Sequence, residues 1–156
     1  MTVTLAQLTE RSGRGVLDHL EREAAVPVID GPQAQGDLIV IPHHLVSDDV
    51  EFPRHGWRAV PPEGIELLRS AAGGNPHALV ADPGTCHWAA SARDRFNLAL
   101  GVLTATAPAY LVHAEHGGTG IAPGTYVVRR QREGTGFVGR RGTRARGGVN
   151  AHLVAD

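Results

Sequence analysis

The segment His113, Ala114, Glu115, His116 places three chemically active side chains within four residues, and two glycines follow it directly. Imidazole and carboxylate together suit borderline divalent metals such as zinc, iron or manganese. Imidazole alone suits proton transfer near neutral pH. The segment therefore indicates a metal site or metal-free acid–base chemistry. The alternative is an ordinary surface pair of His113 and Glu115, with His116 capping a turn.

Strand periodicity predicts how these three side chains are presented. Alternate side chains of a strand share a face, so we expect His113 and Glu115 to point the same way. His116 would face the other side, unless a turn at Gly117 and Gly118 brings it back. Two imidazoles and one carboxylate could then meet at one ion. The spacing is not that of the helical His-Glu-x-x-His signature, in which both histidines share one helix face.

His77 is the fourth candidate metal ligand. It begins a predicted strand after a loop of Gly73, Gly74, Asn75 and Pro76, and such a loop lets the backbone approach a ligand closely. An antiparallel neighbour could bring it beside the later cluster. Asp37 and Glu133 are candidates for groups that orient the ligands.

Other histidines carry less weight. His43 and His44 follow a short apolar strand, where binding residues are common, but adjacent residues cannot both face inward. Cys86 and His87 could form a soft metal pair, although two ligands do not complete a site. Cys86 as a nucleophile would need a base and a lowered pKa, which its flanking residues do not indicate.

The elements that must position these residues are short strands separated by turns. Apolar or β-branched runs predict strands at 38–41, 57–60, 65–68, 77–81, 86–88, 98–106, 109–113 and 126–132. Residues 4–25 read as helical, with an interruption at residues 12–15 and an end at Pro27. The pattern predicts a mainly β protein, an antiparallel sandwich or small barrel with a short N-terminal helical segment.

Composition and charge set broader limits. The 156 residues, of which 42% are hydrophobic, suit one domain. We expect an N-terminal helical segment at 1–27, a β domain at 28–133 and a Gly/Arg-rich tail at 134–156. A net charge of -1 gives no overall attraction for nucleic acid or an anionic membrane. No signal peptide or membrane span is evident, so the expected location is cytoplasmic.

The chain resembles a family of small, largely uncharacterised bacterial proteins. The shared patches are Gln35-Gly36-Asp37, the segment from Gly74 to His77, and His113-Ala114-Glu115-His116, followed by Pro123-Gly124-Thr125-Tyr126 and Gln131-Arg132-Glu133. The resemblance implies that these residues belong together, without implying a reaction. A fainter likeness to the cupin barrel rests on histidines and a glutamate as ligands, but the cupin spacing is absent.

These observations predict a small metal-binding β protein with His113, Glu115, His116 and His77 as ligands. If it is an enzyme, which the sequence does not decide, metal-assisted hydrolysis is the reaction class favoured. The rival hypothesis is a non-enzymatic structural or assembly protein that forms a homo-oligomer or part of a particle. A third is nucleic-acid binding through the Arg-rich tail, which the scarcity of aromatic residues disfavours.

Overall fold

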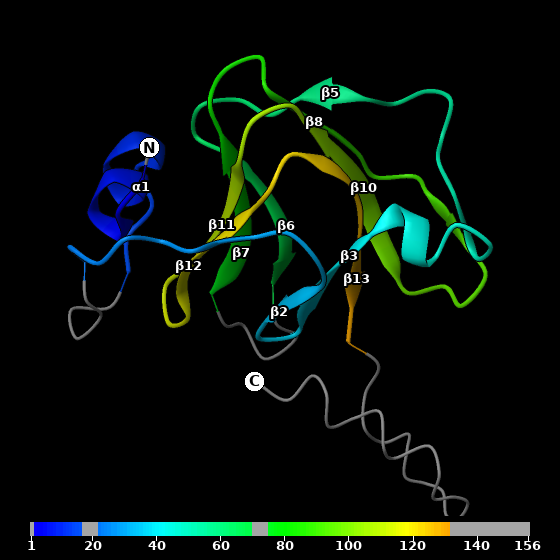
Figure 1. Ribbon diagram of the computed structural model, residues 1–156, viewed down its shortest axis with the longest axis horizontal. Helices are drawn as coiled ribbons and strands as arrows, with labels where there is room; N and C mark the ends of the chain where they lie inside the picture. The colour runs from blue at the N-terminus through cyan, green and yellow to red at the C-terminus, as the bar shows by residue number, and fades with distance from the viewer. Residues whose placement is uncertain (1, 17–21, 70–74, 132–156) are drawn as a thin grey trace, which may run out of the picture.

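The structure is a computed structural model that describes residues 2–16, 22–69 and 75–131 (Figure 1). Two sheets pack face to face. The five-stranded sheet has the order β1 (Val28–Ile29), β12 (Gly117–Ile121), β11 (Ala109–His113), β7 (Pro76–Ala81) and β6 (Ile65–Arg69). The six-stranded sheet has the order β2 (Gln33–Gln35), β3 (Leu38–Pro42), β13 (Gly124–Arg130), β10 (Ala99–Ala105), β8 (Cys86–Ala89) and β5 (Arg58–Ala59).

Strand pairing is antiparallel throughout these sheets except between β1 and β12, which run parallel. The mainly β prediction is confirmed. Among the described strands neither sheet closes on itself, so the molecule is a sandwich and the small-barrel alternative is wrong.

The core between the sheets is aliphatic and follows the two-residue period of the strands. On β3 the side chains of Leu38 and Val40 are fully buried, whereas the residue between them is only partly covered. They meet Leu79 and Leu111 of the other sheet in one cluster of buried side chains. This alternation fixes which side chains of β7 and β11 face inward, and His77 and His113 belong to that inward set.

The helix α1 (Leu5–Ser12) covers the outer face of the five-stranded sheet (Figure 1). Its N-terminus carries a capping box, in which Thr4 and Gln7 each bond the other's backbone N–H. It ends where Gly13 adopts a left-handed conformation with φ 73°. The predicted helix over residues 4–25 is therefore too long: α1 stops at Ser12, and Ala25 forms a β-bridge with Thr4.

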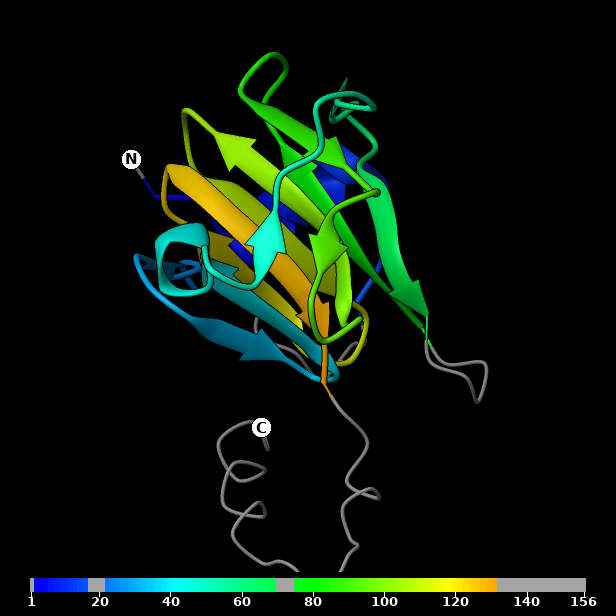
Figure 2. The same cartoon turned by 90° about the vertical axis from the view of Figure 1, so that its right-hand side faces the viewer.

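The outer face of the six-stranded sheet is covered without an α-helix. The short 3₁₀ helix η1 (His43–Leu45) and the two-stranded ribbon of β4 (Val50–Glu51) and β9 (Arg93–Asp94) lie over β13 (Figure 2). Val50, Val102 and Val127 are buried there. Each sheet is therefore covered on its outer face as well as its inner face, and an α-helix covers only the five-stranded sheet.

The predicted strands are confirmed, with ends that shift by one or two residues. The sequence did not predict the short strands β1, β2, β4 and β9, nor the longer β12. The turn predicted at Gly117 and Gly118 is wrong, because both residues begin β12 and the chain reverses at 114–116. Two glycines of β12 are required because neighbouring chain packs too closely for a side chain. A Cβ on Gly118 would lie 3.2 Å from Leu8 Cδ1, and one on Gly120 would lie 2.8 Å from the Pro27 carbonyl oxygen.

No helix within the described residues is long and apolar enough to cross a membrane. The predicted Gly/Arg-rich tail at 134–156 lies outside the described residues.

Candidate metal centre

The β11–β12 hairpin gathers the three residues of the His-x-Glu-His segment. Strand β11 ends at His113, the chain turns through 114–116, and Gly117 with φ 79° begins β12. The expectation that Glu115 follows His113 along a strand is therefore wrong, because Glu115 sits in the turn. One ligand atom from each of His113, Glu115 and His116 lies within 4.8 Å of the others. The turn achieves the proximity that strand alternation could not.

His77, at the start of the neighbouring strand β7, completes a cluster of three imidazoles. Its ring centroid lies 4.4 Å from that of His113 and 6.2 Å from that of His116. The His113 and His116 centroids are 4.6 Å apart. His77 is not part of the group whose ligand atoms lie within 4.8 Å. We call His77, His113, His116 and Glu115 the histidine cluster.

The β2–β3 turn lies directly against the cluster. Gly36, with φ 59°, takes the first central position of this two-residue turn, as in a type II′ hairpin. A Cβ at Gly36 would lie 2.9 Å from His116 Nε2 and 3.2 Å from His77 Cε1. The absence of a side chain at residue 36 therefore leaves the imidazole edges of His116 and His77 uncovered.

Gln35, immediately before this turn, fixes the tautomer of neutral His77. The Gln35 side chain is buried, and its Nε2 donates to the Leu111 carbonyl oxygen at 3.2 Å. Its Oε1 lies 2.9 Å from His77 Nδ1. Because the amide nitrogen is already directed at a carbonyl, the oxygen must face His77 and accept its Nδ1–H. Nε2 of neutral His77 then carries the lone pair.

His113 uses both of its ring nitrogens within the protein. Nδ1 accepts from the backbone N–H groups of Glu115 at 3.1 Å and His116 at 3.2 Å. Nε2 lies 3.1 Å from the Asn75 carbonyl oxygen, to which it must donate. His113 is thus neutral and in the opposite tautomer to His77. By contrast, the ring of His116 makes no hydrogen bond to a described residue, and His116 and Glu115 are exposed.

The electrostatics of the cluster favour neutral imidazoles. Burial, together with the neighbouring His113 and His116, lowers the pKa of His77 to about 4. Burial and His116 also lower the pKa of His113, although its bond to Asn75 and the charges of Glu115 and Asp37 act in the opposite direction. Neutral imidazole is the form that binds metal ions.

The remaining candidates lie elsewhere or serve the fold. Nε2 of His43 bonds the Val50 carbonyl oxygen at 3.0 Å, and its ring packs on Phe52. Cys86 and His87 face opposite sides of β8, so they do not form a pair. Burial raises the pKa of the Cys86 thiol to about 12, which makes it unreactive. Glu133, a predicted orienting group, lies outside the described residues.

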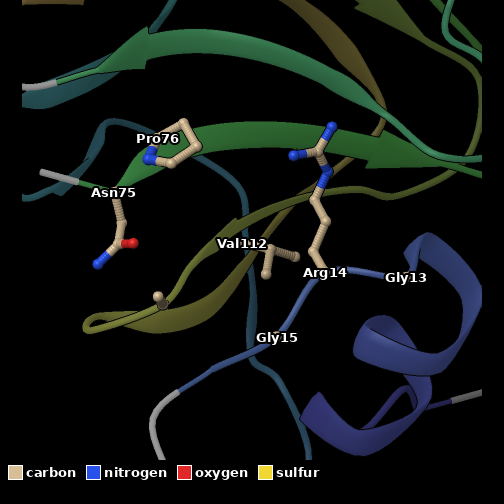
Figure 3. Close-up of a pocket in the computed structure, with 7 residues that line it drawn as sticks. Gly13, Arg14, Gly15, Asn75, Pro76 and Val112 are labelled. Atoms are coloured by element: carbon tan, nitrogen blue, oxygen red, sulfur yellow. The ribbon is translucent and has the colours of Figure 1, made fainter. Parts of the chain in front are cut away.

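A hollow of about 280 Å³ lies on the other side of the same two strands (Figure 3). Val112 of β11 lines it, and because neighbouring strand residues face opposite ways, His113 points away from it. Its one charged lining residue among the described chain is Arg14, whose Nε donates to the Glu63 carbonyl oxygen at 2.9 Å. Arg14 is committed to the fold, so the hollow offers no comparable set of polar groups.

The sequence grouped Gln35 and Gly36 with the histidine segments only through the family resemblance, and it gave neither residue a role at the site. The Gly36–Asp37 pair was a usable signal, since Gly-Asp between two strands is typical of a two-residue hairpin.

Comparison with known proteins finds one family that covers this region. The domain of unknown function DUF8820 matches residues 34–131, from within β2 to just past the end of β13. The chain belongs to this family. No curated protein and no solved structure matches it.

Proposed function

We propose that this protein of the DUF8820 family binds a divalent metal ion of the zinc, iron or manganese class at the histidine cluster. The observation that carries the proposal is the convergence of Glu115 and His116, whose ligand atoms lie within 4.8 Å of each other, with the imidazoles of His113 and His77 packed beside them. Imidazole nitrogen and carboxylate oxygen form a donor set that suits these metals.

Electrostatics support the same interpretation. His77 and His113 have lowered pKa values, so these two imidazoles are neutral at neutral pH, which is the form of imidazole that binds metal ions. The Glu115 carboxylate supplies the negative charge that a divalent cation favours. Three protein ligands would leave one position of a four-coordinate ion for water or substrate, which suits hydrolysis.

The test is metal binding by the full chain. Protein purified without added metal is analysed for bound metals and then titrated with zinc against a chromophoric chelator. We expect about one zinc ion per chain, and His116→Ala should weaken binding by more than about 100-fold, beyond the 10–100-fold typical of groups that only orient ligands. His87→Ala is the matched control, since His87 is exposed on β8. Equal zinc affinity in both variants, or no binding by the wild type, would refute the proposal.

A further inference from the structure

The imidazoles of the cluster are not equivalent, and their hydrogen bonds separate two roles. We propose that His77 Nε2, the Glu115 carboxylate and the His116 imidazole bind the ion, and that His113 shapes the turn carrying two of them. This inference rests on the proposed function and specifies its ligands.

His113 is poorly suited to be a ligand because both of its nitrogens are occupied. Binding an ion through Nδ1 would release the backbone N–H groups of Glu115 and His116, which that atom now accepts. Binding through Nε2 would displace the proton that is donated to Asn75. His113 therefore acts as a local cap that gives the turn its conformation.

His77 has the complementary arrangement. Its Nδ1–H is bound by Gln35 Oε1 at 2.9 Å, and Nε2 makes no hydrogen bond to a described residue. Metal-binding histidines almost always donate their second ring N–H to an oxygen in this way, which fixes the tautomer and the ring orientation. Gln35 is thus a positioning residue for His77.

The separation of the two ligand rings is compatible with one shared ion. With metal–nitrogen bonds of about 2.0–2.1 Å, two imidazoles on a tetrahedral ion have centroids about 5 Å apart. The His77 and His116 centroids are 6.2 Å apart. His116 lies in an exposed turn, so a movement of about 1 Å would bring it into place. Gly36 leaves space over His116 Nε2 for that approach.

The same substitution at His113 and at His77 tests the assignment. Asparagine can replace the Nδ1 hydrogen bond of either histidine, as an acceptor in His113→Asn or as a donor in His77→Asn, and it removes Nε2 in both. We expect His113→Asn to bind zinc within about 3-fold of the wild type. We expect His77→Asn to lose more than about 100-fold, beyond the loss on removing an orienting group. Thermal melts check that both variants fold.

The role of Gln35 is tested in the metal-free protein. Nitrogen-15 NMR of the imidazoles should show His77 protonated only at Nδ1 and His113 only at Nε2. Gln35→Leu should give His77 a mixture of tautomers and weaken zinc binding about 10–100-fold. Gln33→Leu is the matched control, because Gln33 lies two residues earlier on β2 and donates to the Gly120 carbonyl oxygen. Gln33→Leu should change neither the His77 tautomer nor the zinc affinity.

The outcomes separate the two proposals. Equal losses of affinity in His113→Asn and His77→Asn, in a wild type that binds zinc, overturn the division of roles and leave the metal site intact. The opposite tautomers in the metal-free wild type overturn it as well. A folded wild type that binds no zinc overturns the proposed function, and the ligand assignment with it.

Discussion

The histidine cluster and the Asp94–Arg129 ion pair both contain ionisable side chains that the fold buries, but they are bonded very differently. Arg129 on β13 donates twice to Asp94, at 3.0 and 3.1 Å, and the backbone N–H groups of Phe96 and Leu98 supply two more bonds. Each carboxylate oxygen of Asp94 thus accepts two hydrogen bonds. The side chain of Asp94 is only 2% exposed.

The histidine cluster leaves part of its bonding capacity unused. His77 Nε2, the ring of His116 and the carboxylate of Glu115 have no hydrogen-bond partner among the described residues. A polar group needed only by the fold is usually satisfied within the fold, as Asp94 is. The comparison teaches that side chains with unused hydrogen-bonding atoms are the candidates for binding, whereas Asp94 has every carboxylate bond satisfied within the fold.

The largest effect should come from breaking the structural pair. Asp94→Ala removes four hydrogen bonds and leaves the guanidinium of Arg129, 12% exposed, without its carboxylate. We expect the free energy of unfolding to fall by about 3–5 kcal/mol, measured by chemical denaturation. Zinc affinity should stay at the wild-type value while the protein is folded. A weakened zinc affinity would show that the two regions are coupled.

A smaller effect should come from filling the space over the cluster. Gly36→Ala places a methyl group against His116 Nε2 in a left-handed backbone conformation that costs about 1–2 kcal/mol. Gly84→Ala is the matched control, since Gly84 has φ 78° and a Cβ there would meet nothing within 4 Å. Both variants should lose similar stability, measured by thermal melts. Only Gly36→Ala should also lose zinc affinity, and equal affinities would contradict the placement of the site.

The two regions should also respond to acid in different pH windows. The pKa of His77 falls from 6.5 in the unfolded chain to about 4, so between these values the unfolded chain binds a proton that the folded chain does not. The free energy of unfolding of the metal-free protein should therefore fall as pH drops from 6.5 to 4.

Asp94 should act below that window. Burial alone would raise its pKa, but bonds from Phe96, Arg129 and Leu98 hold the pKa below the ordinary 3.8. Its contribution is complete above pH 3.8 and is lost as pH falls further. Denaturation curves from pH 7 to 3 measure both losses. In His77→Asn the free energy of unfolding should fall less between pH 6.5 and 4 than in the wild type. An unchanged fall would show that groups other than His77 cause it.

The smallest effect should come from Thr119 on β12. Its hydroxyl is buried and has no partner among the described residues. Thr119→Val removes an unpaired polar group at nearly constant shape, so unfolding free energy should rise or change by less than about 1 kcal/mol. Zinc affinity should not change. A clear loss of stability in denaturation would reveal a bond to Thr119 that the described residues do not contain.

The sequence predicted the parts of the fold that depend on local pattern. Apolar runs gave the strands at 38–41, 65–68, 77–81 and 109–113, and these became β3, β6, β7 and β11. It failed at β12, where Gly117 and Gly118 were interpreted as a turn. Gly118 and Gly120 are needed because α1 and β1 lie close against them, which no local pattern contains.

The candidate site divides in the same way. His113, Glu115 and His116 were close in sequence, so their proximity needed only a turn. The ion pair of Asp94 and Arg129 went unnoticed because 35 residues separate its partners. The family resemblance grouped Gln35 with the histidine segments, but its bond to His77 was not predicted because the two residues lie 42 positions apart.

The amino-acid order by itself determined which side chains alternate inward on each strand and which chemically active groups share one turn, because both follow from local backbone geometry. Tertiary structure decided which strands are neighbours, and with them the hydrogen-bond partner of each imidazole. A histidine carries its proton on the nitrogen that faces an acceptor. The acceptors for His77 and His113 lie 42 and 38 residues away, so only the folded chain selects which nitrogen is free to bind an ion.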